Sequence, residues 1–369
     1  MSTNAAAGDM RGCYRMRIVH LLAVILLAGV SILIAKDTWA QDGREAMSKP
    51  GAHLVLSIDA DEVRTYWLTS MRDDIRGRLR EAKVGFGGLA LVNDVVQVRL
   101  SKPEDADIAI RALGDLALTV PSGWVDRFLA VMRGSLESEI IIAKGEGGII
   151  TISPTEAGLE RRTSVALNNT LAIVSRRLDG IGIAASTERR GRDRIYVHAP
   201  SLQDTSALKE LLTKPAMLGF HEVHRSISVE EAKRTQTPSG YHIYPSANRD
   251  EGDQLLRETP VLRGDELKNA QAAFDSRTHE PVIAFTFNGS GARKFGDFTK
   301  THVGRPFAIV LDAKVISAPI IREAILGGSG QISGNFTVGD AKQLAVQLRA
   351  GTLPTKLAVV MERVVPSGL

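Results

Sequence analysis

Hydrophobic and polar positions follow one order in two separate stretches of the chain. In the first stretch, residues 53–59 alternate like a half-buried strand and lead into a helical pattern over 61–83. Two further strand patterns flank Asn93-Asp94, which is a hairpin signal. A helix then opens at Pro103, with acidic residues in its first turn, and a last strand is expected near 116–120.

The second stretch repeats this order between residues 148 and 225. A strand over 148–153 precedes a long helix, which Gly180 and Gly182 end. Two strands, a short helix and a strand over 216–223 follow. Both stretches read βαββαβ, the split ferredoxin-like unit. We therefore predict an α+β fold with tandem ferredoxin-like units over 51–120 and 148–225, joined by a linker over 121–147 that carries a short helix.

A third α+β unit is predicted over 226–350, after an irregular polar stretch at 225–258. A helix is expected to run from the Arg263-Gly264-Asp265-Glu266 segment to Phe274, with a strand over 282–287 and a further helix from Gly289. Two strands flank a tight turn at Asp312, a final helix covers 338–350, and residues 351–369 supply a closing strand.

The end of that final helix is a candidate hinge. Gly351 ends the helix and Pro354 blocks its continuation, so Gly351, Leu353 and Pro354 are hinge candidates if the third unit is inserted into the rest. The irregular stretch at 225–258 would hold the second hinge. An ordinary helix stop is the alternative.

The N-terminal sequence predicts that the rest of the chain lies on the outer side of a membrane. Arg11, Arg15 and Arg17 precede an uncharged apolar segment over 18–35, which is the order of a secretory signal or an anchor. The segment is just long enough to span a bilayer. Ala40, before Gln41, resembles a cleavage site. Both a cleaved signal peptide and a single retained anchor stay open for residues 1–40.

Composition narrows the classes of function. The chain has 369 residues, of which 44% are hydrophobic and only 5% aromatic, and its net charge is +4. These values suit two or three globular units and disfavour nucleic-acid binding, because no dense basic stripe accompanies the charge. The single cysteine, Cys13, precedes the apolar segment and cannot form an internal disulfide.

Candidate chemical sites have simpler structural interpretations. A phosphate cradle at Gly327, Gly328 and Gly334 lacks the Lys-Ser/Thr pair that such a loop needs, so turns between strands are expected. Gly289 and Gly291 suit a helix cap better than an anion site. Asp312 suits a turn better than a catalytic role. Among the histidines only His221 and His224 have a spacing to consider for a metal, and at i and i+3 on a strand they would point to opposite faces. We expect no enzyme, no metal and no cofactor.

Dense motifs in the C-terminal third carry a resemblance to a known family. They combine Asn288-Gly289 with Gly291 and Phe295, Leu311-Asp312 with Ala318-Pro319, Gly327-Gly328 with Gly334 and Phe336, and Leu348-Arg349-Ala350-Gly351 with Leu353-Pro354. This pattern resembles the SecD family of protein-export subunits. The stretch 176–204 resembles the same family, and Gly51 to Leu54 with Asp59 resemble the strand after the family's first membrane helix. The resemblance covers Gly51 to the C-terminus.

The resemblance implies a fold and a role. The two ferredoxin-like units would form a base, and residues 226–350 an inserted head of the family's P1 type. The implied role is an accessory of Sec-dependent export. It would bind or guide unfolded exported polypeptide on the periplasmic side of the bacterial inner membrane, with Sec translocase membrane subunits as partners. A diverged envelope interaction module not involved in export is the alternative.

Two departures from the family pattern bear on that role. Residues 47–50 replace the family's usual glycine- and aspartate-bearing stretch. Family members also continue into five more membrane helices, whose polar residues use the proton gradient, whereas this chain ends at Leu369. We therefore expect no proton-coupled motor in this chain.

Overall fold

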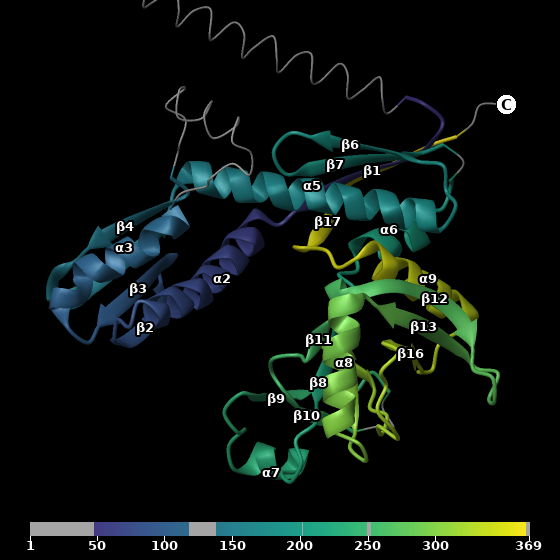
Figure 1. Ribbon diagram of the computed structural model, residues 1–369. Helices are drawn as coiled ribbons and strands as arrows, with labels where there is room; N and C mark the ends of the chain where they lie inside the picture. The colour runs from purple at the N-terminus through teal and green to yellow at the C-terminus, as the bar shows by residue number, and fades with distance from the viewer. Residues whose placement is uncertain (1–47, 118–137, 201, 249–251, 367–369) are drawn as a thin grey trace, which may run out of the picture.

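The structure is a computed structural model, and it describes residues 48–117, 138–200, 202–248 and 252–366. The predicted leader over 1–40 and the short helix of the linker lie outside these residues. The fold is α+β, as predicted, with two sheets in a base, and with two larger sheets and one two-stranded sheet in a head that hangs below it in Figure 1. Within the described residues, no helix is both long and apolar enough to cross a membrane.

The first base sheet has the strand order β17-β1-β7-β6. All of its neighbouring strands are antiparallel. Two helices, α5 and α6, pack against it, and their apolar faces share a core with Leu54, Leu56, Ile195 and Val197. The elements are β1 (Gly51–Ile58), α5 (Glu156–Gly180), β6 (Ser186–Arg190), β7 (Arg194–Ala199), α6 (Ser206–Thr213) and β17 (Leu357–Val365).

The second base sheet has the order β2-β3-β5-β4 and packs against α2 and α3. Its core includes Ile75 and Leu79 from α2, and Val96, Val98 and Ile150 from the strands. Long helix α5 extends from this sheet to the first one, and it contacts α2 on the way (Figure 1). The elements are α2 (Ala60–Glu81), β2 (Phe86–Val92), β3 (Val95–Leu100), α3 (Ala106–Ala117), β4 (Ile140–Lys144) and β5 (Ile149–Pro154).

In the structure, β1 and β5 each lie in the other sheet from the one that the predicted units imply. Strand β1 leads into α2 but pairs with β7 and β17 of the other sheet, while β5 leads into α5 but pairs with β3 and β4. The expectation that 51–120 forms a closed unit is therefore wrong, although both sheets keep the ferredoxin-like strand order. An alternating pattern determines which face of a strand is buried and not which strand it pairs with.

The head contains sheets of order β11-β8-β14-β15 and β12-β13-β16. Five phenylalanines fill its centre, with neighbouring ring centroids 5.1–6.4 Å apart, mostly in tilted or edge-to-face contact. They are Phe220, Phe285, Phe287, Phe295 and Phe307. The elements are β8 (Leu218–Glu222), β11 (Leu262–Arg263), β12 (Leu267–Phe274), β13 (Pro281–Phe287), α8 (Gly289–Thr301), β14 (Phe307–Leu311), β15 (Lys314–Ser317), β16 (Ser329–Ile332) and α9 (Val338–Ala350).

Three expectations for this region are wrong. The strand predicted to close the second ferredoxin-like unit is β8, which pairs with β14 and β11 in the head, and β17 closes the base instead. The segment predicted as a helix up to Phe274 is the strand β12, after a single 3-10 turn at Gly264–Glu266. The stretch predicted as irregular forms α7 (Val229–Arg234) and a hairpin of β9 (Tyr241–Tyr244) and β10 (Gln254–Arg257).

Candidate functional site

The chain crosses between base and head twice, and the two crossing segments lie side by side. It leaves the base after α6, at residues 214–217, and returns at residues 351–356. The Leu353 amide donates to the carbonyl of Pro215 at 3.1 Å, and the Thr352 hydroxyl donates to the carbonyl of Ala216 at 3.1 Å. The first crossing therefore lies before β8, not in the stretch 225–258 where a hinge was expected.

Arg177 of α5 binds both crossing segments. Its guanidinium is fully buried and donates to the carbonyls of Leu211 at 2.8 Å and Lys214 at 2.7 Å. Longer bonds of 3.4 Å reach Pro215 and, on the return segment, Gly351. Burial lowers the pKa of Arg177 to about 10, against the opposing influence of the Asp312 charge. A buried cation here satisfies main-chain acceptors of both crossings at once.

Helix α9 of the head rests directly on the base. The Gln347 side chain is buried and donates to the carbonyl of Leu211 at 3.2 Å, at the end of α6. Val346 packs against Gly180 at the end of α5, where a Cβ atom would lie only 2.7 Å from a Val346 methyl carbon. The close approach therefore depends on the missing side chain at Gly180.

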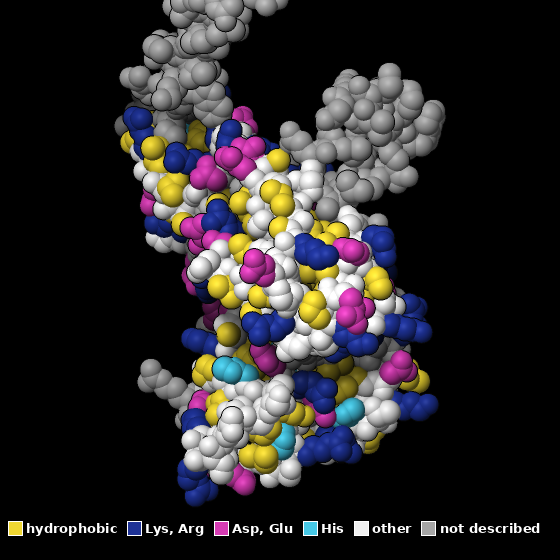
Figure 2. Space-filling model, turned by 90° about the vertical axis from the view of Figure 1, so that its left-hand side faces the viewer, with side chains coloured by type: hydrophobic (Ala, Val, Ile, Leu, Met, Phe, Trp, Pro, Cys, Tyr) yellow, Lys and Arg dark blue, Asp and Glu magenta, His cyan; other side chains and the backbone are white. Residues whose placement is uncertain are grey.

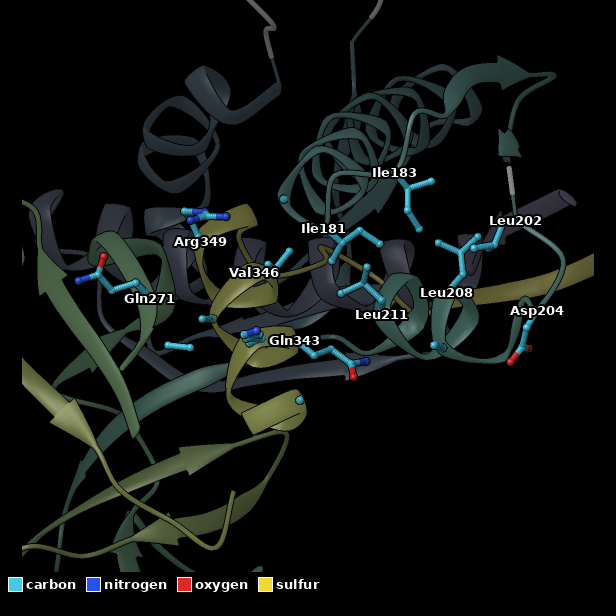
Figure 3. A pocket seen from close by; sticks show the side chains of 16 residues that line it. Ile181, Ile183, Leu202, Asp204, Leu208, Leu211, Gln271, Gln343, Val346 and Arg349 are labelled. Atoms are coloured by element: carbon cyan, nitrogen blue, oxygen red, sulfur yellow. The ribbon is translucent and has the colours of Figure 1, made fainter. Parts of the chain in front are cut away.

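A groove of about 570 Å³ runs beside this contact. Its base side is apolar, and in Figure 3 the side chains of Ile181, Ile183, Leu202, Leu208 and Leu211 converge there. Its head side consists of α9 and one strand of the head. The head residues that line it are Gln271, Ala272, Gly339, Lys342, Gln343, Ala345, Val346 and Arg349.

Charged groups are sparse and mixed around this groove. Asp204 lines one end, and Lys342 and Arg349 line the α9 side. The same mixture of charges covers the face of the molecule in Figure 2, where Lys and Arg side chains alternate with Asp and Glu. Among the described residues, no group of His, Cys, Asp and Glu is arranged to hold a metal ion. The lining of the groove is thus mainly aliphatic, with a few charged groups of both signs.

Gly289, Gly291 and Asp312, which were considered as chemical sites, lie in the head and do not line the groove. Gly289 and Gly291 begin α8, where the Asn288 side chain accepts from the amides of Ser290 and Gly291, as a helix cap does. Asp312 has a φ of 48° in the turn between β14 and β15, and its carboxylate accepts from the Met217 amide at 2.8 Å. Asp312 therefore joins a head hairpin to the first crossing.

The other family-motif positions pack the head. Phe295 lies in the phenylalanine cluster, and the Pro319 carbonyl accepts from the Phe307 amide. Gly328 lies against Ala292 of α8, and Gly334 against the ring of Phe336. A further position, Gly327, is in the loop before β16. None of these six positions lines the groove described above.

Sequence reasoning missed the residues of the groove itself. Ile181 and Ile183 lie just past the end of α5 and look like ordinary apolar residues. Gln271 and Ala272 lie in the segment misread as a helix. The strong apolar spacing of α6, with Leu208 and Leu211 on one face, was the only available signal. The hinge candidates do lie on the return crossing: they are Gly351, Leu353 and Pro354. The φ of Gly351 is 101°.

Family models match two parts of the chain. The model for the SecDF P1 head subdomain matches residues 241–355, and the model for the N-terminal part of the SecDF P1 domain matches residues 167–225. A solved structure of SecDF, described as a membrane component that enhances protein export, is similar at a TM-score of 0.44 and 29% identity, covering 55% of this chain and 94% of that one.

Curated relatives match most of the chain. The protein translocase subunit SecD of Rickettsia conorii is 34% identical over 316 residues, which are 85% of this chain and 57% of the relative. SecD of Rhodobacter capsulatus is 35% identical over 317 residues, or 85% and 55% of the two chains. SecD of Acetobacter pasteurianus is 31% identical over 360 residues, or 95% and 65%. The chain spans a little over half the length of the first two relatives. The chain is thus similar to the SecD family of protein translocase subunits over 85% of its length, and the family models that match it are those of the SecDF P1 region.

Proposed function

We propose that this chain is an accessory of Sec-dependent protein export that binds an unfolded segment of exported polypeptide in the groove between base and head. The observation that supports this is the apolar groove, with walls from both parts of the molecule. A site for small polar substrates would need convergent polar groups, whereas this one offers aliphatic side chains and a few mixed charges. Unfolded chains expose apolar side chains that such a surface can cover.

The same proposal places the groove on the periplasmic side of the inner membrane and assigns the chain a binding role without a chemical step. Membrane subunits of the Sec translocase are the proposed partners, by analogy with the SecD relatives. We also propose that Gly351, Leu353 and Pro354 act as a hinge, because they lie where the chain returns from head to base. The described residues would then grip or guide a chain, and energy coupling is no part of this proposal.

Site-specific crosslinking tests the function. A photoreactive benzoylphenylalanine at Lys342, on the groove, should capture an exported protein that is stalled during translocation. The matched control is the same group at Arg192, whose side chain is 83% exposed in the turn between β6 and β7, outside the lining of the groove. Capture at Lys342 but not at Arg192 supports the proposal. Absence of substrate capture at Lys342, or equal capture at both positions, contradicts it, and capture of folded envelope proteins alone favours an interaction module outside export.

A further inference from the structure

Strand β12 is an edge strand, and its hydrogen-bonding pattern can be assigned. It pairs with β13 on one side and has no strand on the other within the described residues. The Asp275 amide donates to the Glu280 carbonyl at 2.9 Å, so that pair is hydrogen-bonded. In an antiparallel ladder bonded pairs alternate with non-bonded ones. Residues 273, 271 and 269 therefore face β13, and residues 270, 272 and 274 direct their main-chain groups outward.

The opposite side of β13 gives the same assignment. The Phe287 amide donates to the Gly328 carbonyl, toward β16. Residues 283, 285 and 287 of β13 therefore face β16, which leaves residues 282, 284 and 286 to face β12. Their partners in the register are residues 273, 271 and 269. Two independent hydrogen bonds thus agree on which amides of β12 point away from the sheet.

Part of this outward edge is open. Ala270 is fully buried, whereas Ala272 is exposed and Phe274 is 59% exposed. Within the described parts of the chain, the main-chain N–H and C=O groups of Ala272 and Phe274 form no hydrogen bond on that side. Open edges of this kind readily pair with an additional strand.

The open edge is also part of the groove. Gln271 and Ala272 are consecutive residues of a strand, so their side chains point to opposite faces of the sheet. Both nevertheless line the same groove, which means that the groove includes the strand edge between them. The aliphatic side chains of Ile181, Leu208 and Val346 line the rest of it (Figure 3). A polypeptide in the groove can therefore form main-chain hydrogen bonds with β12 and apolar contacts with the side chains beyond it.

We propose that the unfolded polypeptide binds as an additional β-strand on β12, hydrogen-bonded to Ala272 and Phe274, and this proposal rests on the function proposed above. Main-chain pairing recognises any extended segment, and alternate side chains of that segment reach the apolar wall. The ligand class is an extended stretch with apolar residues at every second position and no proline at the pairing positions. Interior strands of folded domains, which are already paired on both sides, are excluded.

N-methylated peptides test this mode of binding on the whole 369-residue chain. The parent is a fluorescent ten-residue peptide that alternates leucine with serine, and each derivative carries one N-methyl group, which removes one N–H donor. The apolar wall selects the leucine face, so the register can slip only by two residues. Methyl groups on one set of alternate residues, either the leucines or the serines, should weaken binding about tenfold, the equivalent of one lost hydrogen bond. Methyl groups on the other set should leave binding unchanged. Equal weakening by both sets overturns strand addition alone, whereas a parent peptide that does not bind overturns the proposed function as well.

A main-chain variant of the protein provides a second measurement. The Ala272 amide points outward, so Ala272→Pro removes a donor of the edge and no hydrogen bond to β13. Gln271→Ala is the matched control, because it shortens a neighbouring side chain in the groove and keeps the main chain. Ala272→Pro should lose at least tenfold in affinity for the parent peptide with an unchanged unfolding temperature, and Gln271→Ala should lose less than threefold. Equal affinity of Ala272→Pro and the unchanged protein overturns the proposal, and the peptide series decides the matter if that variant does not fold.

Discussion

Replacing Arg177 with methionine should loosen both crossings between base and head. The change keeps a long side chain in the space and removes every donor, so the carbonyls of Lys214 and Gly351 lose their buried partner, while that of Leu211 keeps its bond from Gln347. A buried acceptor without a partner costs about 1–3 kcal/mol, and a hydrogen bond to a charged group contributes about 1.5–3 kcal/mol. The loss should therefore concentrate on the two segments that these carbonyls belong to.

The magnitude follows from two opposing terms. The Nη1 atom of Arg177 lies 2.8, 3.1 and 2.7 Å from the carbonyls of Leu211, Leu212 and Lys214, and its two hydrogens are shared among these three acceptors. Together with the two longer Nη2 bonds to Pro215 and Gly351, they contribute about as much as three hydrogen bonds to a charged group, roughly 5–9 kcal/mol. Against this, the fall in the pKa of Arg177 from 12.5 to about 10 means that burial costs the charged form about 3 kcal/mol, at about 1.4 kcal/mol per pKa unit. The methionine avoids that cost, so the net loss of unfolding free energy should be about 2–6 kcal/mol.

Hydrogen exchange with mass spectrometry is the suitable assay, because it reports on each segment separately. Exchange of the amides at 210–217 and 351–356 should accelerate at least tenfold in Arg177→Met, while the core of the β2–β5 sheet stays protected. Arg176→Met is the matched control, since Arg176 is exposed and, among the described residues, its side chain donates only to the Ala172 carbonyl of its own helix. Both folded and unfolded chains hold the Arg177 proton below pH 10, so the difference should be the same at pH 6 and pH 9.

The refuting results are specific. Unchanged protection at both crossings in Arg177→Met would show that the carbonyls find other partners and that the buried guanidinium does not hold the segments. Equal acceleration in Arg176→Met would show that loss of positive charge on α5, and not loss of the buried donors, causes the effect. A uniform loss of protection over the whole molecule would show that Arg177 stabilises the global fold and has no particular effect on the crossings.

Two further predictions concern packing and pH. Gly158→Ala should destabilise the base by more than 2 kcal/mol in urea unfolding, because its Cβ would overlap the main chain of Glu139. The control is Gly77→Ala, where no atom lies within 4 Å of the added carbon, and it should stabilise α2 by about 0.5–1 kcal/mol. Equal effects of the two substitutions would refute the steric reasoning. Burial lowers the pKa of His53 below its ordinary 6.5, so the unfolded chain takes up the proton first and stability should fall as the pH drops below 6.5. Unfolding midpoints of His53→Gln between pH 7 and pH 5 should show a shallower decline, and an unchanged slope would contradict the assignment to His53.

Elements with strong periodicity could be predicted from the sequence, but their partners could not. The alternation at residues 53–59 correctly indicates β1, and the hairpin signal at Asn93-Asp94 correctly indicates the turn between β2 and β3. Nothing in an alternating apolar strand distinguishes a partner in its own repeat from one in the next. The exchange of β1 and β5 therefore needed the three-dimensional structure.

The groove was hidden by a conflict between local propensity and tertiary contact. The segment KNAQAAF of β12 is rich in residues that favour a helix, and it follows an acidic turn that looks like a helix start. In the structure it is a strand, because β13 pairs with it along its length and α9 buries Ala270. The helix interpretation placed Gln271 and Ala272 on a helix and so removed the strand edge from consideration.

The exchange of strands also imposes an order on folding as the chain is synthesised. All core residues of the head lie between Ala216 and Leu348, so the head can form its core before β17 has been synthesised. Strand β1 is made before the head, yet Gly51 pairs with Val365 of β17, which follows the head in the sequence. Closing so long a loop is slow. The β17-β1-β7-β6 sheet is therefore completed after the head, and until then β1 has one edge that a chaperone or a neighbouring chain can occupy.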